Sequence, residues 1–356
     1  MGAMRTAVIL AGGWGERLWP LSTRERPKQL LDVDGGGTLV SRTVRRVEPL
    51  LDLERGLVLT GESLRATILP ELSPIPEGRV IGEPAGRNTA PAIALAAHVL
   101  SRENPDSVMV VLPADHLIGD AASFRETLEI AIGAAEKHDA LVTLGIRPTR
   151  PETEYGYIRA GEAAAPDVRR VDSFVEKPDA ETAALYLADG SYLWNSGMFI
   201  WRAERILRET AKYLPDVSDA LDLVTGEPGG DEFRSSIAEY YDSVPSVSID
   251  YGVMEKADDV VVVPATFDWD DVGAWSALER VWEQDSMGNA TEGDVLLVDS
   301  RNNVVCSDGN VVAVLGMTDV VVVSTGQGTL VCPKDRARDV REVVAELRLR
   351  HERRRS

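Results

Sequence analysis

The sequence has few cysteines and no long apolar run. Only Cys306 and Cys332 occur among 356 residues, and neither has a metal-ligand spacing or a neighbouring histidine. We interpret both as buried free thiols, which suits a cytoplasmic protein. No uninterrupted run approaches the roughly eighteen apolar residues of a membrane-spanning helix. The apolar segment 7–11 is too short for a signal peptide. We therefore expect a cytoplasmic protein with no membrane partner.

Positive charge is also scarce. The formal net charge is −20, with 38 lysines and arginines against 58 acids. Binding to nucleic acid depends on basic groups that neutralise phosphates, so we expect no nucleic-acid partner. An anionic small molecule remains compatible with this charge. Exposed charges beyond about 10 Å are largely screened, and a few nearby cations can dominate at a site.

What the chain does have is an alternation of short apolar runs and amphipathic segments through its first half. This alternation predicts an α/β fold with a mainly parallel sheet. The pattern becomes more mixed after residue 156. The expected strands are 7–10, 56–60, 80–82, 107–112, 140–145, 170–176, 197–201 and 260–264, and the expected helices are 39–51, 90–102, 124–137, 180–187, 204–213, 231–240 and 274–282.

The C-terminal part has a different texture. After residue 289, short β runs alternate with turns of Asp, Asn, Gly and Ser, and 335–349 has a helical pattern. This predicts a separate all-β segment, either a short β-helix or a small barrel, followed by a terminal helix. We therefore expect two domains, residues 1–286 and residues 287–356.

The most informative segment follows the first expected strand. It reads Ala-Gly-Gly-Trp-Gly-Glu-Arg-Leu-Trp-Pro-Leu from residue 11, with Pro-Lys at 27 and 28. Gly12, Gly13 and Gly15 allow a tight turn that exposes backbone N–H groups, and Arg17 and Lys28 add positive charge. Such a turn at the carboxyl end of a parallel strand suits a polyphosphate. The glycines alone would also fit an ordinary strand-to-helix turn.

Two better-known phosphate loops do not match this segment. The dinucleotide fingerprint requires a third glycine where Leu18 stands, which disfavours a nicotinamide-dependent dehydrogenase. The P-loop string Gly-x-x-x-x-Gly-Lys-Ser/Thr does not occur in the chain.

The string Gly-Gly-x-Gly-x-Arg-Leu-x-Pro-Leu, followed by Pro-Lys, resembles the signature of the sugar-1-phosphate nucleotidylyltransferases. Further motifs along nearly the whole chain match that family. The chain is most similar to the branch that transfers GMP from GTP to α-D-mannose 1-phosphate, giving GDP-mannose and pyrophosphate. The resemblance implies a Rossmann-like nucleotidyltransferase sheet, Mg²⁺, a C-terminal left-handed β-helix and a homodimer. Another hexose 1-phosphate, such as glucose 1-phosphate, or a non-catalytic regulatory homologue are the alternatives.

Two acidic segments are candidate metal ligands. Asp115 follows an apolar strand, where a carboxylate points into the ligand crevice of an α/β sheet, although an aspartate there can also cap a helix. Mg²⁺ takes one or two carboxylates plus phosphate oxygens. The resemblance places the second ligand at Asp271, with Asp270 ranked behind it. It also implies that Arg17 and Lys28 stabilise charge on the reacting phosphates, so that the expected catalytic residues are Arg17, Lys28, Asp115 and Asp271.

The polar loop 82–91 precedes an expected helix and matches the family's base- and ribose-binding segment. An acid with an amide or a backbone N–H can read the donor edge of guanine, whereas adenine presents the opposite pattern. Asn88 or Thr89 would instead serve as a helix cap in an ordinary loop. The expected nucleotide-binding residues are Leu10, Ala11, Gly12, Gly13, Gly15, Glu83, Pro84, Arg87, Asn88 and Thr89.

Three further strings match the sugar side of the family. By resemblance, Glu176 binds sugar hydroxyls, Lys177 binds the sugar phosphate, and Gly156 and Asn195 bind the hexose. Taken alone, the neighbouring Glu176 and Lys177 would be interpreted as a surface ion pair. The expected sugar-phosphate-binding residues are Tyr155, Gly156, Glu176, Lys177 and Asn195, with Asp250 and Tyr251 as weaker candidates.

Overall fold

The computed structural model describes residues 4–355, and the chain divides into two compact units. The first unit contains the chain up to Gly12, Thr43–Ala114 and Ile118–Trp269, and the second contains Gly13–Arg42, Asp115–Leu117 and the chain from Asp270 onward. The division at residues 286 and 287 follows chain order and stays a prediction. Among residues 4–355, no helix has the length and apolar character needed to cross a bilayer.

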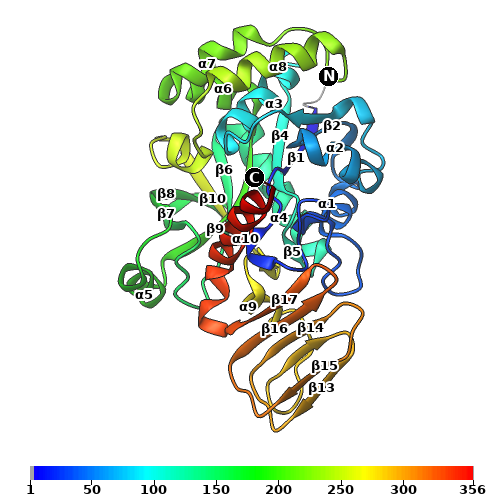
Figure 1. Ribbon diagram of the computed structural model, residues 1–356. Coiled ribbons are helices and arrows are strands. Elements are labelled where there is room, and N and C mark those ends of the chain that lie inside the picture. The colour runs from blue at the N-terminus through cyan, green and yellow to red at the C-terminus, as the bar shows by residue number, and fades with distance from the viewer. Residues whose placement is uncertain (1–3, 356) are drawn as a thin grey trace. The chain divides into compact units, whose positions relative to one another are not determined.

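The first unit is built on a large mixed sheet, which within the described chain has nine strands in the order β3-β2-β1-β4-β9-β6-β10-β8-β7 (Figure 1). Neighbours among β1 to β4 pair in parallel, as do β6 and β10, whereas β9 and β8 run against their neighbours. The expected α/β fold is therefore confirmed. The strands are β1 (Arg5–Ala11), β2 (Asp52–Gly61), β3 (Val80–Glu83), β4 (Val108–Pro113), β6 (Leu141–Ile146), β7 (Tyr157–Ala165), β8 (Val168–Val175), β9 (Tyr192–Arg202) and β10 (Val260–Pro264).

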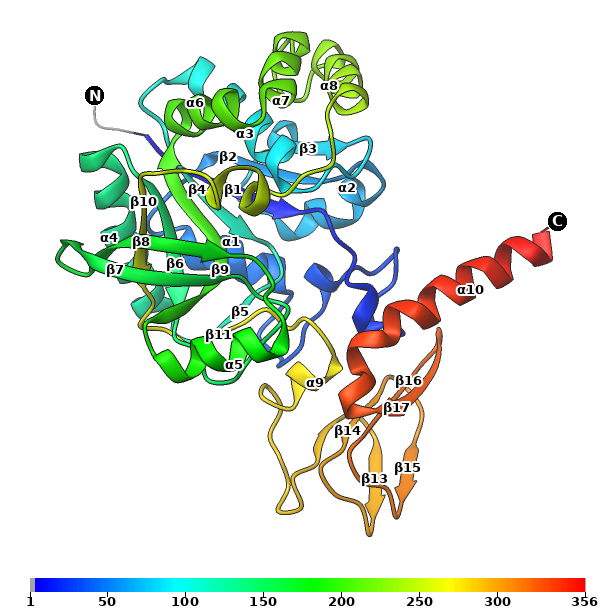
Figure 2. The same ribbon diagram turned by 90° about the vertical axis from the view of Figure 1, so that its left-hand side faces the viewer.

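Capping residues mark the ends of several helices in the first unit. The Asp120 carboxylate accepts the first backbone N–H groups of α4, and Asp179 caps α5, which ends at the left-handed Gly190. Alanines cover much of α3 and allow it to be buried almost all round, with α6 and α7 beside it (Figure 2). The helices are α2 (Glu62–Ile68), α3 (Thr89–Glu103), α4 (Ala121–His138), α5 (Ala180–Asp189), α6 (Ala203–Tyr213), α7 (Pro215–Ala220) and α8 (Asp231–Ser243), followed by a π-helical turn at Asp250–Met254.

The second unit has a core of its own, in which segment 13–42 packs against the chain after residue 270. The indole N–H of Trp275 donates to the Trp19 carbonyl at 3.0 Å, and that of Trp282 donates to the Val33 carbonyl at 2.7 Å. The helix expected over 274–282 is wrong in length, because α9 spans only Trp275–Leu278. The chain then continues in tight turns, in which the backbone N–H of Arg280 donates to the Ala277 carbonyl and that of Val281 donates to the Leu278 carbonyl.

The C-terminal strands form stacked parallel pairs. Strands β12, β14 and β16 are parallel neighbours, β13 pairs in parallel with β15, and β17 closes the larger sheet as an antiparallel hairpin (Figure 2). This confirms a β-helix-like segment, whereas the handedness stays a prediction. The elements are β12 (Ala290–Glu292), β13 (Val295–Val298), β14 (Val304–Ser307), β15 (Val312–Leu315), β16 (Val320–Thr325), β17 (Gly328–Pro333) and α10 (Val340–Arg355). Three short elements contain residues of both units, namely α1 (Leu39–Val47), β5 (Leu117–Ile118) and β11 (Trp269–Asp270).

Buried asparagines connect the successive turns of this segment. The Asn303 amide donates to the Asn289 side chain at 3.1 Å and to the Met317 carbonyl at 3.0 Å. Cys306 lies in the core, but Cys332 is only partly buried on β17, so the interpretation of both cysteines as buried thiols is correct for Cys306 alone.

Candidate active site

Three residues far apart in sequence meet at one ammonium group in the second unit. Lys28 lies in the 3₁₀ turn Lys28–Leu30, and its side chain is 8 % exposed. Its Nζ donates to Asp115 Oδ2 at 2.8 Å and also to the backbone carbonyl of Asp271. Burial by itself would raise the pKa of Asp115, but the Lys28 ammonium and His116 hold that pKa below its usual range. Asp115 is therefore an anion at neutral pH.

The glycine turn supports this lysine directly. Gly15 has φ +76°, and a β-carbon there would lie 2.5 Å from Lys28 Cβ. The Lys28 N–H donates to the Trp14 carbonyl at 3.0 Å, and the Ser22 hydroxyl donates to the Gly15 carbonyl. A β-carbon at Gly13 would meet nothing within 4 Å, so the steric need for glycine in this turn is clearest at Gly15. Arg17 belongs to the adjoining 3₁₀ turn Glu16–Leu18.

The backbone next to Asp271 is strained. Val272 is fully buried with φ +45°, a conformation that β-branched residues rarely adopt and that occurs preferentially at functional sites. The Gly273 N–H donates to Asp271 Oδ1 at 3.1 Å, and a β-carbon at Gly273 would lie 2.7 Å from Asp271 Oδ2. The chain therefore bends so that the Asp271 carboxylate folds over residue 273.

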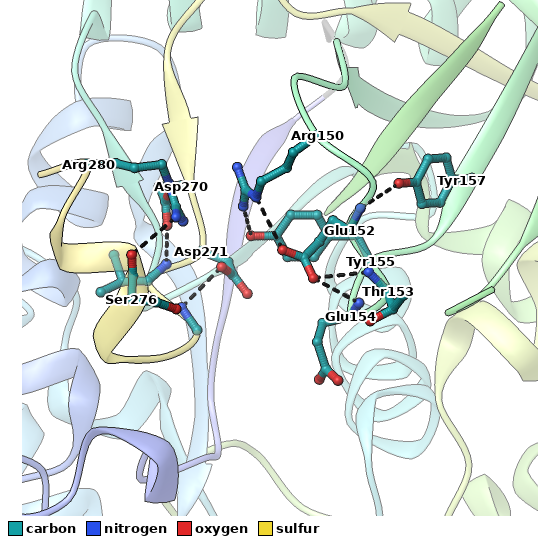
Figure 3. Close-up of polar contacts among 12 residues, drawn as sticks. Arg150, Glu152, Thr153, Glu154, Tyr155, Tyr157, Asp270, Asp271, Ser276 and Arg280 are labelled. Carbon is teal, nitrogen blue, oxygen red and sulfur yellow. Dashed lines mark hydrogen bonds and ion pairs between the residues drawn. The ribbon is translucent and has the colours of Figure 1, made fainter. Parts of the chain in front are cut away.

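The neighbouring Asp270 has a different environment (Figure 3). Its Oδ1 accepts the Val272 N–H at 2.8 Å, and its Oδ2 accepts the Arg280 Nε–H at 2.7 Å. Burial raises the pKa of Asp270, while Arg280 opposes that rise. Both carboxylate oxygens of Asp270 are thus used within the loop. The ranking of Asp271 ahead of Asp270 as a metal ligand stays a prediction.

The nucleotide-loop residues of the first unit gather at the ends of β1 and β3. Leu10 and Ala11 end β1, and Glu83, the last residue of β3, places its Oε2 3.5 Å from where a β-carbon of Gly12 would lie. Pro84 follows directly and is exposed. Gly12 and Glu83 are therefore brought together, with Leu10 and Ala11 directly before Gly12 in the chain, and their role in a ligand site stays a prediction.

Other residues of the same loop are engaged locally. The side-chain Oδ1 of Asn88 accepts the Thr89 N–H at 2.9 Å as the cap of α3, which is the alternative capping role for this residue. The Thr89 hydroxyl accepts the Ile249 N–H at 2.9 Å, and Arg87 donates to the Tyr241 carbonyl at 2.8 Å. Tyr241 was not singled out from the sequence, because a tyrosine near the end of an amphipathic helix carries no distinguishing signal.

The expected sugar residues form a second cluster in the first unit. The Asn195 amide donates to Asp250 Oδ1 at 2.8 Å, and the Thr143 hydroxyl donates to Asn195 Oδ1 at 3.2 Å. The Glu176 side chain is 8 % exposed, and its Oε1 pairs with the Lys177 ammonium. Its Oε2 is buried without a hydrogen-bond partner among the described residues. A buried carboxylate oxygen in this state is a ready acceptor for a ligand hydroxyl.

Tyr155 is placed differently from its neighbours in the sequence. It is buried, with its ring edge-on to Trp194 and Trp269 at centroid distances of 5.2 and 5.1 Å. The turn before β7 is held by Glu152, whose carboxylate pairs with Arg150 and accepts the Thr153 and Glu154 N–H groups (Figure 3). This packing supports a structural role for Tyr155 beside the sugar cluster.

Asp250 lies in an unfavourable place for a negative charge. Burial, followed by the nearby Glu176 carboxylate, raises the pKa of Asp250 to about 6, while the Asn195 and Lys177 side chains oppose that rise. Because this pKa lies above the value of an unfolded aspartate, ionised Asp250 destabilises the fold. The penalty is absent below the unfolded value, grows between it and about pH 6, and is complete above that.

Replacing Asp250 with asparagine should therefore stabilise the protein at pH 8, by about 1–3 kcal/mol, with little effect near pH 4.5. An asparagine oxygen can still accept the Asn195 amide. Urea unfolding at the two pH values measures the difference. Asp242→Asn, an exposed position on α8, is the control and should change stability little at either pH. An equal gain at both pH values would contradict the charge explanation.

The structure also bears on metal binding. Among the described residues no group of three or more His, Cys, Asp or Glu side chains could hold a metal ion. A cation at Asp115 and Asp271 would therefore have two carboxylates and would take its other ligands from phosphate and water, which is the donor set Mg²⁺ prefers. The Lys28 ammonium bonds one oxygen of Asp115 and the backbone carbonyl of Asp271, so both candidate ligands lie beside the same lysine.

Comparison with known proteins settles the family. A family model described as nucleotidyl transferase matches residues 6–287. The chain belongs to the nucleotidyl transferase family. A second model, described as a MannoseP isomerase/GMP-like beta-helix domain, matches residues 293–347. Enzymes of the nucleotidyl transferase family typically use a divalent metal ion, which is compatible with the carboxylate pair at Asp115 and Asp271.

Named relatives of this nucleotidyl transferase extend over almost its entire length. The alginate biosynthesis protein AlgA of Pseudomonas aeruginosa is 43% identical over 96% of this chain and 71% of its own. A mannose-1-phosphate guanylyltransferase of Escherichia coli is 41% identical over 97% of this chain and 74% of its own. A crystal structure described as mannose-1-phosphate geranyltransferase from Thermus thermophilus matches with a TM-score of 0.86 and 41% identity, covering 97% of this chain and 99% of that one.

Proposed function

We propose that this nucleotidyl transferase transfers GMP from GTP to α-D-mannose 1-phosphate, giving GDP-mannose and pyrophosphate. The observation that carries the proposal is that the buried Lys28 ammonium bonds both the Asp115 carboxylate and the Asp271 backbone carbonyl, although the three residues lie far apart in sequence. A regulatory homologue without activity would be expected to lack one of these groups. The choice of substrates is supported by the Escherichia coli relative, which is named for them.

The chemistry asked of the chain is positioning and charge stabilisation. A phosphate oxygen of the sugar phosphate attacks the α-phosphorus of GTP in line, and pyrophosphate leaves. The nucleophile is already an anion, so no general base is needed. Asp115 and Asp271 would hold Mg²⁺, which neutralises phosphate charge when bound. Arg17 and Lys28 stabilise charge on the α-phosphate and on the leaving pyrophosphate.

The remaining residues are assigned to the two substrates. For the nucleotide, Gly13 and Gly15 belong to the phosphate turn, and Leu10 to Gly12 with Glu83 and Arg87 bind the nucleoside. For the sugar, Glu176 and Asn195 accept or donate hydrogen bonds to hexose hydroxyls, and Lys177 binds the phosphate. Gly156 provides the close approach, since a β-carbon there would overlap Glu176 Oε2.

The experiment that tests this function is a pyrophosphate-release assay on the purified full chain with Mg²⁺. GTP, ATP and UTP are each paired with mannose 1-phosphate and with glucose 1-phosphate. Release should be fastest with GTP and mannose 1-phosphate. Faster release with glucose 1-phosphate would correct the sugar, and faster release with another nucleotide would correct the base. Absence of release with every pair would overturn the proposal in favour of a regulatory protein.

We also propose that the protein is a cytoplasmic homodimer formed through its β-helix-like segment. Strands β13 and β15 expose a row of apolar side chains, with Leu296, Val298 and Leu315 at 57%, 45% and 71% exposure. Val298 is the cross-strand partner of Leu315, so these side chains form one continuous face. Exposed apolar faces of this kind are typical of protein interfaces.

Replacing both Leu296 and Leu315 with aspartate should convert the dimer to a monomer, because charge on this face opposes its burial. Sedimentation equilibrium should give about twice the chain mass of 38.7 kDa for the wild type and the mass of one chain for the variant. Leu185→Asp is the matched control, since Leu185 is 64% exposed on α5. A variant that remains dimeric, or a monomeric wild type, would contradict this interface.

A further inference from the structure

Tyr241 contacts the nucleotide loop at two of its residues. It lies in the last turn of α8 and is fully buried. Its hydroxyl donates to Glu83 Oε1 at 2.8 Å, while its carbonyl accepts the Arg87 Nε–H at 2.8 Å. One residue outside the loop is thus bonded to both its acid and its arginine.

The bond from Tyr241 leaves the second oxygen of Glu83 close to Gly12. Glu83 Oε2 lies 3.5 Å from the point where a β-carbon of Gly12 would be, at the carboxyl ends of β1 and β3. Ligands of open α/β sheets bind at these strand ends. Burial raises the pKa of Glu83, and the Tyr241 hydroxyl opposes that rise. The hydroxyl therefore favours the anionic form of Glu83 as well as fixing its orientation.

The rest of the loop is held without this hydroxyl. The Val247 N–H donates to the Arg87 carbonyl at 3.2 Å, and the Ala90 N–H donates to the Val247 carbonyl at 3.1 Å. The Ile249 N–H donates to Thr89 Oγ1 at 2.9 Å. These bonds fix the backbone of the loop, so the hydroxyl of Tyr241 acts on the Glu83 carboxylate rather than on the path of the chain.

We propose that Tyr241 is a positioning residue for nucleotide selection, whose hydroxyl holds Glu83 so that Oε2 accepts the N1–H and N2–H₂ donor edge of guanine. The inference rests on the proposed function, which makes GTP the nucleotide. Adenine has an acceptor at N1, so the lone pair of that nitrogen would face the Glu83 carboxylate. Neither the adenine N1 nor the carboxylate oxygen would then have a hydrogen-bond partner. Selectivity for guanine then depends on a carboxylate that is held in one orientation.

The test compares Tyr241→Phe with Tyr240→Phe in the full chain. Tyr240 is the matched control because it is equally buried and adjacent, and its hydroxyl donates to the Pro91 carbonyl at 2.9 Å instead of to Glu83. Calorimetric titration with GTP and with ATP gives the ratio of dissociation constants for each protein. Tyr241→Phe should lower the ratio that favours GTP by about tenfold or more, which is the usual effect of losing a hydrogen bond to a charged group. Tyr240→Phe should leave the ratio unchanged even if it lowers the melting temperature.

The remaining outcomes separate the inference from the function on which it rests. A wild type without preference for GTP would overturn both the proposed nucleotide and this role. A wild type that prefers GTP and a Tyr241→Phe variant that retains the ratio, or weakens both nucleotides equally, would overturn the role of Tyr241 alone. In a Glu83→Ala background, Tyr241→Phe should have no further effect on the ratio, and an undiminished effect there would also overturn it.

If Tyr241→Phe does not fold, adding Glu83→Gln provides a second measurement. The amide removes the buried charge that has lost its donor, so the double variant should fold and should lack the preference for GTP. A double variant that stays unfolded, or that folds and keeps the preference, would overturn the pairing of Tyr241 with Glu83.

Discussion

Replacing Lys28 with alanine is expected to lower kcat by roughly 10²–10³-fold, the usual cost of removing one preorganised charge-stabilising group. The ammonium is almost fully buried, and it donates to Asp115 Oδ2 and to the Asp271 carbonyl. The turn positions this side chain, because a β-carbon at Gly15 would lie only 2.5 Å from Lys28 Cβ. Steady-state kinetics with GTP and mannose 1-phosphate give the number, and thermal unfolding shows whether the fold is kept.

Lys334→Ala is the control for loss of a paired lysine in the same unit. Its ammonium donates to the Asn302 carbonyl at 2.9 Å and pairs with Glu279 at 2.7 Å, and its side chain is 16% exposed. This variant should lose some stability and keep kcat. If Lys28→Ala is folded and turns over GTP near the wild-type rate, the assignment of the reaction to this cluster is wrong.

Two members of the cluster could be singled out from the sequence because each stands beside a strong local signal. Asp115 follows an apolar strand, and Lys28 follows the glycine turn. The meeting of these residues with Asp271 could be expected only by resemblance, since no local rule relates positions so far apart. The strain at Val272 could not be predicted at all, because a valine in a left-handed conformation runs against its own preference.

Elements with mixed or polar composition were predicted less well than the apolar ones. Strand β7 was not expected, because Arg159 to Ala165 has no apolar alternation and is formed by pairing with β8. Segment 13–42 shares a core with the residues after 270 through Trp275 and Trp282, and its place in the chain gives no indication of this packing. Both features depend on contacts distant in sequence, which a local pattern does not contain.

Gly156→Ala is expected to lower kcat/KM for mannose 1-phosphate by about 10²-fold, since a misplacement of about 1 Å in a positioning group has that effect. The added β-carbon would overlap Glu176 Oε2 and lie 3.2 Å from Asn195 Cβ. The Glu176 carboxylate can move away because it is the end of a flexible side chain, so the fold should be kept. The loss should appear mainly in the KM for the sugar phosphate, with the KM for GTP close to the wild-type value.

Gly161→Ala tests whether the effect belongs to Glu176 or to the hairpin. Gly161 lies in β7, and a β-carbon there would overlap the carboxylate of Asp172, an exposed residue of β8 with no assigned role. Each variant therefore places one added methyl group against a carboxylate, that of Glu176 or that of Asp172. Only Gly156→Ala should impair use of the sugar phosphate, because only Glu176 has a buried oxygen available to a hexose hydroxyl. Equal losses in both variants would attribute the effect to the hairpin, and a Gly156→Ala enzyme with unchanged KM values would remove Glu176 from the sugar site.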